Sequence, residues 1–206
     1  MLLWVGLLAL VLGVAAFAVD RRAVHLFHDG ISARWFRRIR LTTDFAKGAR
    51  WLAISLILIA VSWLARRTLG DGPTLRLVFR AALAFLASLA VGSAVLHGIK
   101  IVLGRRRPRD ELEHGLTGFL PLRFDLQYDS FPSGHAMTIC CVAVILSAAL
   151  PALAPLWFAL ALYLSLTRAL LNAHFLSDVF IGAGIGLLAS RETVLLLFPD
   201  LVRPWF

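Results

Sequence analysis

Charged residues and cysteines are both scarce in this 206-residue chain. Asp, Glu, Lys and Arg make up 16% of it, whereas about a quarter is usual for a soluble domain. The two cysteines, Cys140 and Cys141, are adjacent and lie inside an apolar run. Neighbouring cysteines rarely pair with each other, and the sequence has no CxxC motif or Cys/His cluster. We therefore interpret both as buried packing residues.

Acidic residues are fewer than basic ones: the chain has 12 Asp and Glu and 21 Lys and Arg, which gives a net charge of +9. A basic balance is typical of proteins that bind nucleic acid, anionic lipid or an anionic substrate. The arginines lie at the ends of apolar blocks and form no separate basic domain, so nucleic acid is not the expected partner. Anionic headgroups or phosphate substrates fit better.

Hydrophobic residues make up 60% of the chain and come in long blocks. They follow neither a 2-residue nor a 3.6-residue rhythm, which favours membrane spans over a soluble core. We expect an all-α polytopic membrane protein, with a single domain over residues 1–206 and six transmembrane helices. The candidate spans lie near residues 1–19, 48–65, 77–99, 136–150, 153–171 and 175–198.

The first apolar block could be mistaken for a signal peptide, because Ala-Phe-Ala at residues 16–18 resembles a small-residue cleavage site. No positive residue precedes this block, however, and charged residues follow it at 20–22, so we expect a retained helix. The basic segment that comes next has two open interpretations. It is either a short helix in the headgroup layer or a solvated basic loop. Its aromatic and aliphatic residues alternate with arginines, at Ile31, Arg34, Trp35, Phe36, Arg37, Arg38, Ile39 and Arg40.

The first polar motif joins Lys100, at the end of the third block, to Arg107 and Pro108. Proline disfavours helix for the residue before it, so the chain is expected to turn at Arg107. A lysine at a helix end and a turned-back arginine can place two cations on one small anion. The alternative is a pair of side chains that snorkel at a membrane boundary.

The second motif is Pro132-Ser133-Gly134-His135, directly before the fourth block. Ser133 is a natural N-cap, and Gly134 lets the backbone approach a ligand closely. The helix that follows would offer free N–H groups and a favourable dipole to phosphate, with His135 placed to donate a proton. The alternative is an ordinary capped helix start with a boundary histidine.

The third motif is Arg168, His174 and Asp178. We expect His174 and Asp178 to share one helix face if the sixth span begins near residue 174. A carboxylate there would fix the imidazole tautomer and leave the other nitrogen as a nucleophile. The alternative is a polar cluster that closes a helix hairpin. An ionisable group this close to the membrane, however, favours a functional site.

Six spans would bring the three motifs to the same membrane face, because segments 20–50, 104–132 and 168–174 all fall on one side. Region 100–178 resembles the type 2 phosphatidic acid phosphatase family, which includes vanadium haloperoxidases and bacterial lipid phosphatases. The order of the three motifs and the spacing within each are those of that family. One departure is Thr167, where the family usually has serine, and the hydroxyl is retained.

The resemblance implies a reaction through a phosphohistidine. His174 would attack phosphorus, Asp178 would orient it, and His135 would protonate the leaving oxygen. Three cationic side chains can replace a metal ion, so we expect no cofactor and activity in the presence of EDTA. The remaining matched positions would bind phosphate, namely Lys100, Arg107, Ser133, Gly134 and Arg168.

The expected partner is a lipid phosphate in the bilayer of a bacterial inner membrane. Candidate substrates are phosphatidylglycerol phosphate, phosphatidate, undecaprenyl diphosphate and lipid A phosphate. The resemblance favours a periplasmic site, whereas the eight Lys and Arg of residues 20–50 argue for the cytoplasmic side. Two other functions stay open, a lipid phosphotransferase with the same site and a non-catalytic transporter or scaffold. The sequence does not indicate the oligomeric state.

Overall fold

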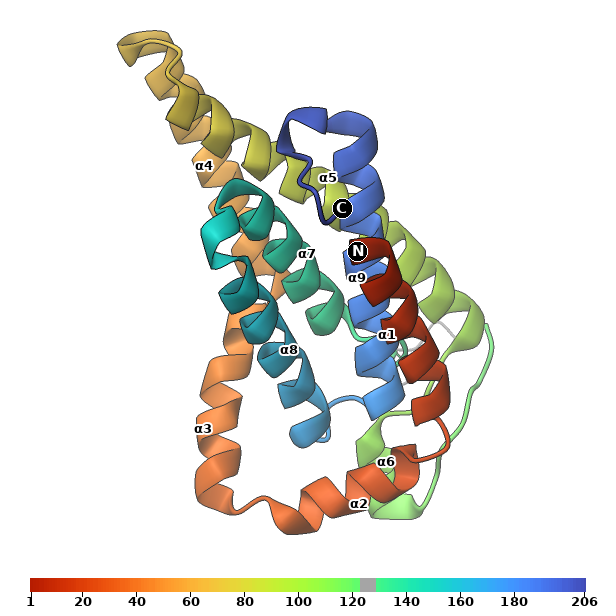
Figure 1. Ribbon diagram of the computed structural model, residues 1–206. Coiled ribbons are helices and arrows are strands. Elements are labelled where there is room, and N and C mark those ends of the chain that lie inside the picture. Colours follow the sequence, from red (N-terminus) through yellow and green to blue (C-terminus); the bar gives the residue numbers. More distant parts are fainter. Residues whose placement is uncertain (123–128) are drawn as a thin grey trace.

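Helices form almost all of the ordered architecture in the computed structural model, which describes residues 1–122 and 129–206 (Figure 1). Within those ranges there is no strand, and only isolated bridges join Arg105 to Phe119 and Asp129. The helices are α1 (Leu2–Ala16), α2 (Asp20–Gly30), α3 (Ala33–Thr43), η1 (Asp44–Ala46), α4 (Gly48–Leu69), α5 (Pro73–Leu103), α6 (Pro108–His114), α7 (Gly134–Ala149), η3 (Pro151–Leu153), α8 (Ala154–Leu170), α9 (Leu176–Leu197) and η4 (Pro199–Leu201).

All six apolar blocks form helices, namely α1, α4, α5, α7, α8 and α9. Four segments are long and apolar enough to cross a membrane: α4, α5, α8 together with η3, and α9. Helix α1 passes this test only together with α2, from which it is bent by 86°. Helix α7 has 16 residues, so it is short for a span. The described residues thus hold four candidate spans, or five with the bent pair, and the six-span arrangement stays a prediction.

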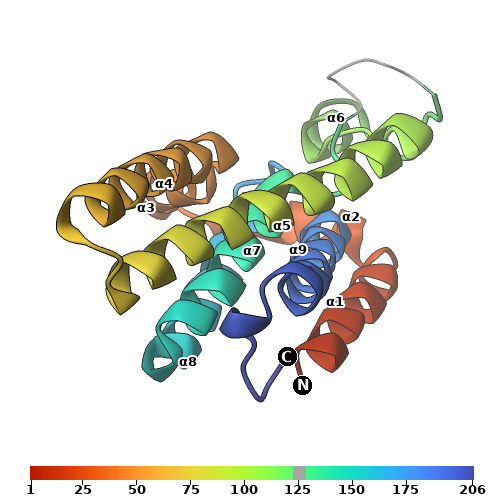
Figure 2. The ribbon, with the colours of Figure 1, turned by 90° about the horizontal axis from the view of Figure 1, so that it is seen from above.

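Helix α9 lies at the centre of the bundle, between α1, α5 and α7 (Figure 2). Small residues make this close packing possible. A Cβ added at Gly186 would lie 2.3 Å from the carbonyl oxygen of Met137 in α7, and one at Gly184 would lie 2.6 Å from Leu10 in α1. Gly184 and Gly186 therefore let α9 pack closely against its neighbours. Cys140 and Cys141 are buried and free, as expected.

Helices α2, α3 and α6 gather at one end of the bundle, which is the lower end in Figure 1. Helix α2 packs against α6, α8 and α9, and α3 packs against α8. The segment of residues 20–46 is helical, so the alternative of a solvated loop is wrong, while its place in a headgroup layer stays a prediction. The two chain termini meet at the other end, where the Leu2 N–H donates to the Trp205 carbonyl oxygen at 2.7 Å.

Candidate active site

The segment between α8 and α9 places His174 outside any helix. Asn172 takes a left-handed conformation with φ of 51°, and the N–H groups of Ala173 and His174 both donate to the Arg168 carbonyl oxygen. Helix α9 begins only at Leu176. The expectation that His174 and Asp178 share a helix face is therefore wrong. A tight turn, which the apolar pattern does not reveal, separates the histidine from the helix.

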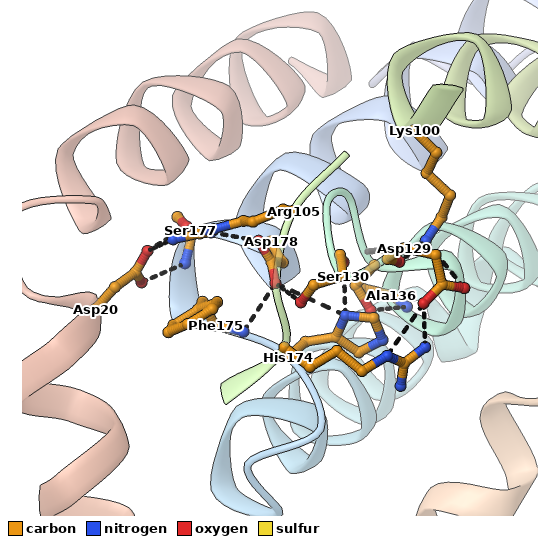
Figure 3. Close-up of polar contacts among 12 residues, drawn as sticks. Asp20, Lys100, Arg105, Asp129, Ser130, Ala136, His174, Phe175, Ser177 and Asp178 are labelled. Atoms are coloured by element: carbon orange, nitrogen blue, oxygen red, sulfur yellow. Dashed lines mark hydrogen bonds and ion pairs between the residues drawn. The ribbon is translucent and has the colours of Figure 1, made fainter. Parts of the chain in front are cut away.

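The direct partner of His174 is the backbone of Ser130 (Figure 3). The Nδ1 atom of His174 lies 2.7 Å from the Ser130 carbonyl oxygen, whereas it lies 3.7 Å from Oδ2 of Asp178. A carbonyl oxygen can only accept, so Nδ1 carries the proton and Nε2 has its lone pair free. Burial lowers the pKa of His174, against the opposing effect of the Asp178 carboxylate. The imidazole is therefore neutral near pH 7 and suited to nucleophilic attack.

The Asp178 carboxylate is fully buried and held by three donors. Its Oδ2 accepts from the Ser130 hydroxyl at 2.6 Å and from the Phe175 N–H at 2.9 Å. Its Oδ1 accepts from an Arg105 guanidinium nitrogen at 2.5 Å. Sequence reasoning missed both Ser130 and Arg105. Each lies within or beside a predicted motif, but no spacing rule distinguishes it from its neighbours.

Lys100 and Arg107 converge on one small anion, which is the side chain of Asp129. Figure 3 shows Lys100 reaching toward Asp129. Arg107 donates to Oδ1 of Asp129 through Nε at 3.0 Å and through a second nitrogen. The Lys100 ammonium donates to the Asp129 carbonyl oxygen and lies 3.9 Å from Oδ2. Arg107 is the N-cap of α6 and Pro108 its first residue, as expected from the turn. Two cationic side chains thus meet one carboxylate here.

The second motif forms the start of α7. Ser133 is the N-cap, and its hydroxyl oxygen lies 3.5 Å from the Ala136 N–H. The Ser133 N–H donates to the Asp178 carbonyl oxygen at 3.0 Å, which fixes this turn on α9. The first N–H groups of a helix have no partner within it, so those at Gly134 and His135 remain available to an anion.

Arg168 completes the cluster from the last turn of α8. Its charge interacts with Arg107, His174 and His135, and Lys100 also interacts with His174. Thr167 donates to the Thr43 hydroxyl at 2.9 Å, which ties α8 to the end of α3. The structure thus brings the side chains of all three motifs together at one end of the bundle.

The surroundings of His135 include two further charged residues. Lys47 and Asp44, from the turn between α3 and α4, lie within electrostatic range of this half-buried imidazole. Sequence reasoning assigned neither residue to the site. The part of the chain that the structure describes has no group of three or more His, Cys, Asp or Glu side chains that could hold a metal ion. The site is cationic, and its chemistry is that of anion binding.

Comparisons with known proteins point to one family. The model of the PAP2 superfamily matches residues 81–200. Two curated relatives are named lipid A 1-phosphatase. That of Rhizobium etli is 32% identical over 104 residues, which are 50% of this chain and 45% of the relative. That of Rhizobium johnstonii is 31% identical over 113 residues, 54% of this chain and 46% of the relative. The chain thus spans about half the length of these relatives.

Two solved structures share the fold. A transmembrane PAP2-type phosphatidylglycerolphosphate phosphatase from Bacillus subtilis superposes with a TM-score of 0.64 at 20% identity. That match covers 100% of this chain and 98% of the other. LpxE from Aquifex aeolicus also gives a TM-score of 0.64, at 18% identity, over 86% of this chain and 95% of the other. At such identities the likeness extends to the fold alone.

Proposed function

The chain belongs to the PAP2 superfamily, and from that membership and the geometry of the site we propose that it is a bacterial membrane lipid phosphatase. It hydrolyses a phosphomonoester or diphosphate of a lipid through a phosphohistidine. The observation that carries the proposal is the position of His174. A neutral imidazole with Nε2 free lies within the electrostatic reach of Lys100 and Arg168. Such a site combines a nucleophile with fixed positive charge, which phosphoryl transfer requires.

The first step is attack by Nε2 of His174 on phosphorus. The Nε2–P bond forms as the bond from phosphorus to the lipid oxygen breaks. The imidazole gains positive charge, while its Nδ1–H stays bonded to the Ser130 carbonyl oxygen. The buried Asp178 carboxylate, 3.7 Å from Nδ1, stabilises that charge. In the second step water attacks phosphorus and releases His174 and inorganic phosphate.

Charge on the phosphate oxygens is neutralised by three cations. Lys100 and Arg107 already converge on a carboxylate, and a phosphate that displaces Asp129 would inherit these partners. Arg168 approaches from α8, with its buried Nε free of hydrogen-bond partners among the described residues. The N–H groups at the start of α7 add further donors. Fixed donors of this kind contribute on the order of 3 kcal/mol each to transition-state stabilisation.

Proton transfer is assigned to His135. Burial and the charge of Arg168 lower the pKa of His135 to about 3 in the free protein. The negative charge of the bound phosphate must therefore raise that pKa before His135 donates a proton to the leaving lipid oxygen in the first step; in the second step His135 accepts a proton from the attacking water. Because the three cations and the helix N-terminus supply the positive charge, the proposed reaction needs no metal ion.

The substrate is proposed to be a lipid because apolar helices surround the site and the matched relatives are named as lipid A phosphatases. Lipid A phosphate, phosphatidylglycerol phosphate, phosphatidate and undecaprenyl diphosphate are the candidates to compare. We propose a single domain with six spans in the inner membrane. Its active site would face the periplasm.

The deciding experiment compares wild type with His174→Ala, both purified in detergent with EDTA, on a panel of those four lipids. We expect wild type to release inorganic phosphate and the variant to fall by at least about 1,000-fold. Equal rates for the two proteins would refute the nucleophile, and loss of wild-type turnover on chelation would refute the metal-free reaction. Analysis of the products separates hydrolysis from transfer to a second lipid. A transporter or scaffold would release no phosphate.

A further inference from the structure

Helix α9 begins with a residue that cannot cap it. Phe175 is the N-cap and has no polar side chain, so the first N–H groups of the helix need an acceptor from elsewhere. Asp20 supplies it from a position 157 residues away, where its Oδ1 accepts from the Ser177 N–H at 3.0 Å. Asp20 is itself the first residue of α2. Its carboxylate therefore lies between two helix N-termini, whose dipoles favour a negative charge.

Arg105 connects Asp20 to the predicted catalytic aspartate (Figure 3). One guanidinium nitrogen donates to Oδ2 of Asp20 at 2.7 Å, and the other donates to Oδ1 of Asp178 at 2.5 Å. Ser177 joins the same chain, since its hydroxyl accepts from Arg105 at 2.7 Å and donates to Asp20 at 2.5 Å. The exposed fraction of each of these four residues is 5% or less.

Aromatic rings enclose the Arg105 guanidinium. Its central carbon lies 4.0 Å from the ring centroid of Phe175, 4.8 Å from that of Phe17 and 5.3 Å from that of Phe119. Cation–π contacts of this kind favour arginine over a compact ammonium group. The guanidinium therefore has one well-defined position, from which it reaches both carboxylates.

The net charge of the hydrogen-bonded residues Asp20, Arg105 and Asp178 matters because His174 becomes positive when it attacks phosphorus. Arg105 alone would neutralise Asp178 and leave no net charge beside the imidazole. With Asp20 included, two carboxylates and one guanidinium leave a net charge of −1 in a buried site. Electrostatic interactions are strong where water is excluded, so that residual charge stabilises the positive imidazole.

We propose that Asp20 and Arg105 are positioning residues for the reaction at His174. Through the Asp20–Arg105–Asp178 chain they fix the start of α9 and leave one negative charge beside the nucleophile. This inference rests on the proposed function. It extends the site to α2, outside the matched region 81–200. The predicted consequence is that Asp20 affects the transition state and not the binding of phosphate.

A purely structural role, the attachment of α2 to the bundle, needs a matched control. Glu111 provides one, because it is a buried carboxylate of α6 that pairs with Arg21, the neighbour of Asp20, at 2.9 Å. The Glu111 carboxylate also lies 3.3 Å from Nε2 of His25, which is a residue of α2 like Arg21. Glu111→Gln weakens the attachment of α2 without touching Asp178. Asp20→Asn keeps the size of the side chain but removes its charge.

The experiment measures kcat and KM of the full chain in detergent, on the panel lipid that wild type hydrolyses fastest. We expect Asp20→Asn to lower kcat on the order of 10- to 100-fold with KM within about 3-fold of wild type. Arg105→Lys, which retains charge but not the two-pronged geometry, should lie between wild type and Arg105→Gln. Glu111→Gln should retain wild-type kcat. An equal fall in Glu111→Gln, or an effect of Asp20→Asn on KM alone, overturns the proposal.

A second measurement does not depend on turnover. Calorimetry gives the affinity for orthovanadate, a mimic of the phosphoryl-transfer transition state, and for inorganic phosphate. Asp20→Asn should lower the affinity for vanadate by about the same factor as it lowers kcat/KM. It should lower the affinity for inorganic phosphate by less than about 2-fold. Equal losses for the two anions overturn the inference. An inactive wild type with this binding difference intact would instead count against the proposed reaction alone.

If Asp20→Asn does not fold, Ser177→Ala replaces it. That substitution removes one hydroxyl of the chain and leaves every charge in place. A fall in kcat of about 3-fold or more supports the proposal, and an unchanged kcat refutes it.

Discussion

Helices α4 and α9 are close to equal in sequence terms and opposite in their surroundings. Each has 22 residues, and their most apolar windows have mean hydropathies of 1.8 and 1.6. Yet 11% of that window is buried in α4 and 61% in α9. Hydropathy measures the free energy of transfer of a side chain out of water. That free energy does not distinguish a helix that faces lipid from one that faces protein. Side-chain size and not hydropathy therefore distinguishes the two helices.

The side chains of α4 are large and face outward, as at Leu56, Ile57 and Val61, which are 51%, 61% and 60% exposed. Helix α9 instead carries Gly182 and Gly186 where the backbone of its neighbours approaches most closely. The central helix is also the one that carries Asp178 at its start. Close packing around α9 thus serves the site, because it fixes the carboxylate relative to the turns that hold the other motifs.

The largest expected effect comes from a methyl group added to this interface. A Cβ at Gly182 would lie 2.3 Å from the Ser133 carbonyl oxygen, so Gly182→Ala must displace the start of α7. We expect a cost of about 1–3 kcal/mol in stability and a fall of at least about 10-fold in kcat. Thermal unfolding in detergent and phosphate release measure these. Gly98→Ala in α5, with no atom within 4 Å, is the control and should match or exceed wild-type stability. Equal behaviour of the two variants would contradict the packing argument.

A smaller effect, on stability and not on kcat, is expected from truncations along the two helices. Val194 of α9 has no exposed surface, whereas Ile57 of α4 is 61% exposed. Val194→Ala should cost about 1–3 kcal/mol through the cavity that it leaves, and Ile57→Ala less than about 1 kcal/mol. Chemical denaturation of both variants in the same detergent measures the difference. If Ile57→Ala is the more damaging substitution, α4 is covered by protein and the contrast between the helices is wrong.

The smallest effect concerns titratable groups that precede the two helices. Burial lowers the pKa of His174 ahead of α9, and the hydrogen bond from Lys47 lowers the pKa of Asp44 ahead of α4. The His174 imidazole should therefore stay neutral even at pH values somewhat below 6.5, the ordinary pKa of histidine. The shift at exposed Asp44 should shrink with added salt, whereas the shift caused by burial should change little. NMR titration of the free protein at two salt concentrations tests this. A pKa of His174 at or above 6.5 would contradict the burial.

The sequence predicted the helices well because their signal is local. Each of the six apolar blocks forms a helix, and Ser133 is the N-cap of α7 as predicted, whereas the short helix α6 that begins at Pro108 was not predicted. For the segment that forms the short helices α2 and α3, the sequence allowed two interpretations, a helix in the headgroup layer and a solvated loop. These two helices pack against α6 and α8, and no local sequence pattern reveals those contacts. The number of spans is not settled by length, because α1 is bent away from α2 and α7 is short.

The candidate site divides in the same way. The motif residues were identified from type and spacing, and the structure brings them together. The expected geometry of His174 was wrong, since the histidine precedes α9 and bonds to the Ser130 backbone. Asp20 and Asp129 were also missed, since a carboxylate gains its role here only from an arginine distant in the chain.

The sequence by itself determined which groups are cationic, acidic or apolar, and which apolar segments are helical. Those properties follow from the residue and its near neighbours. Only the tertiary structure decided which atom holds the imidazole proton in place, which anion the cations meet, and which helix is central. Hydrogen bonds act over about 3 Å, so their partners are set by the packing of distant segments. The Ser130 carbonyl oxygen on His174 and the Asp20 carboxylate on α9 are two such contacts.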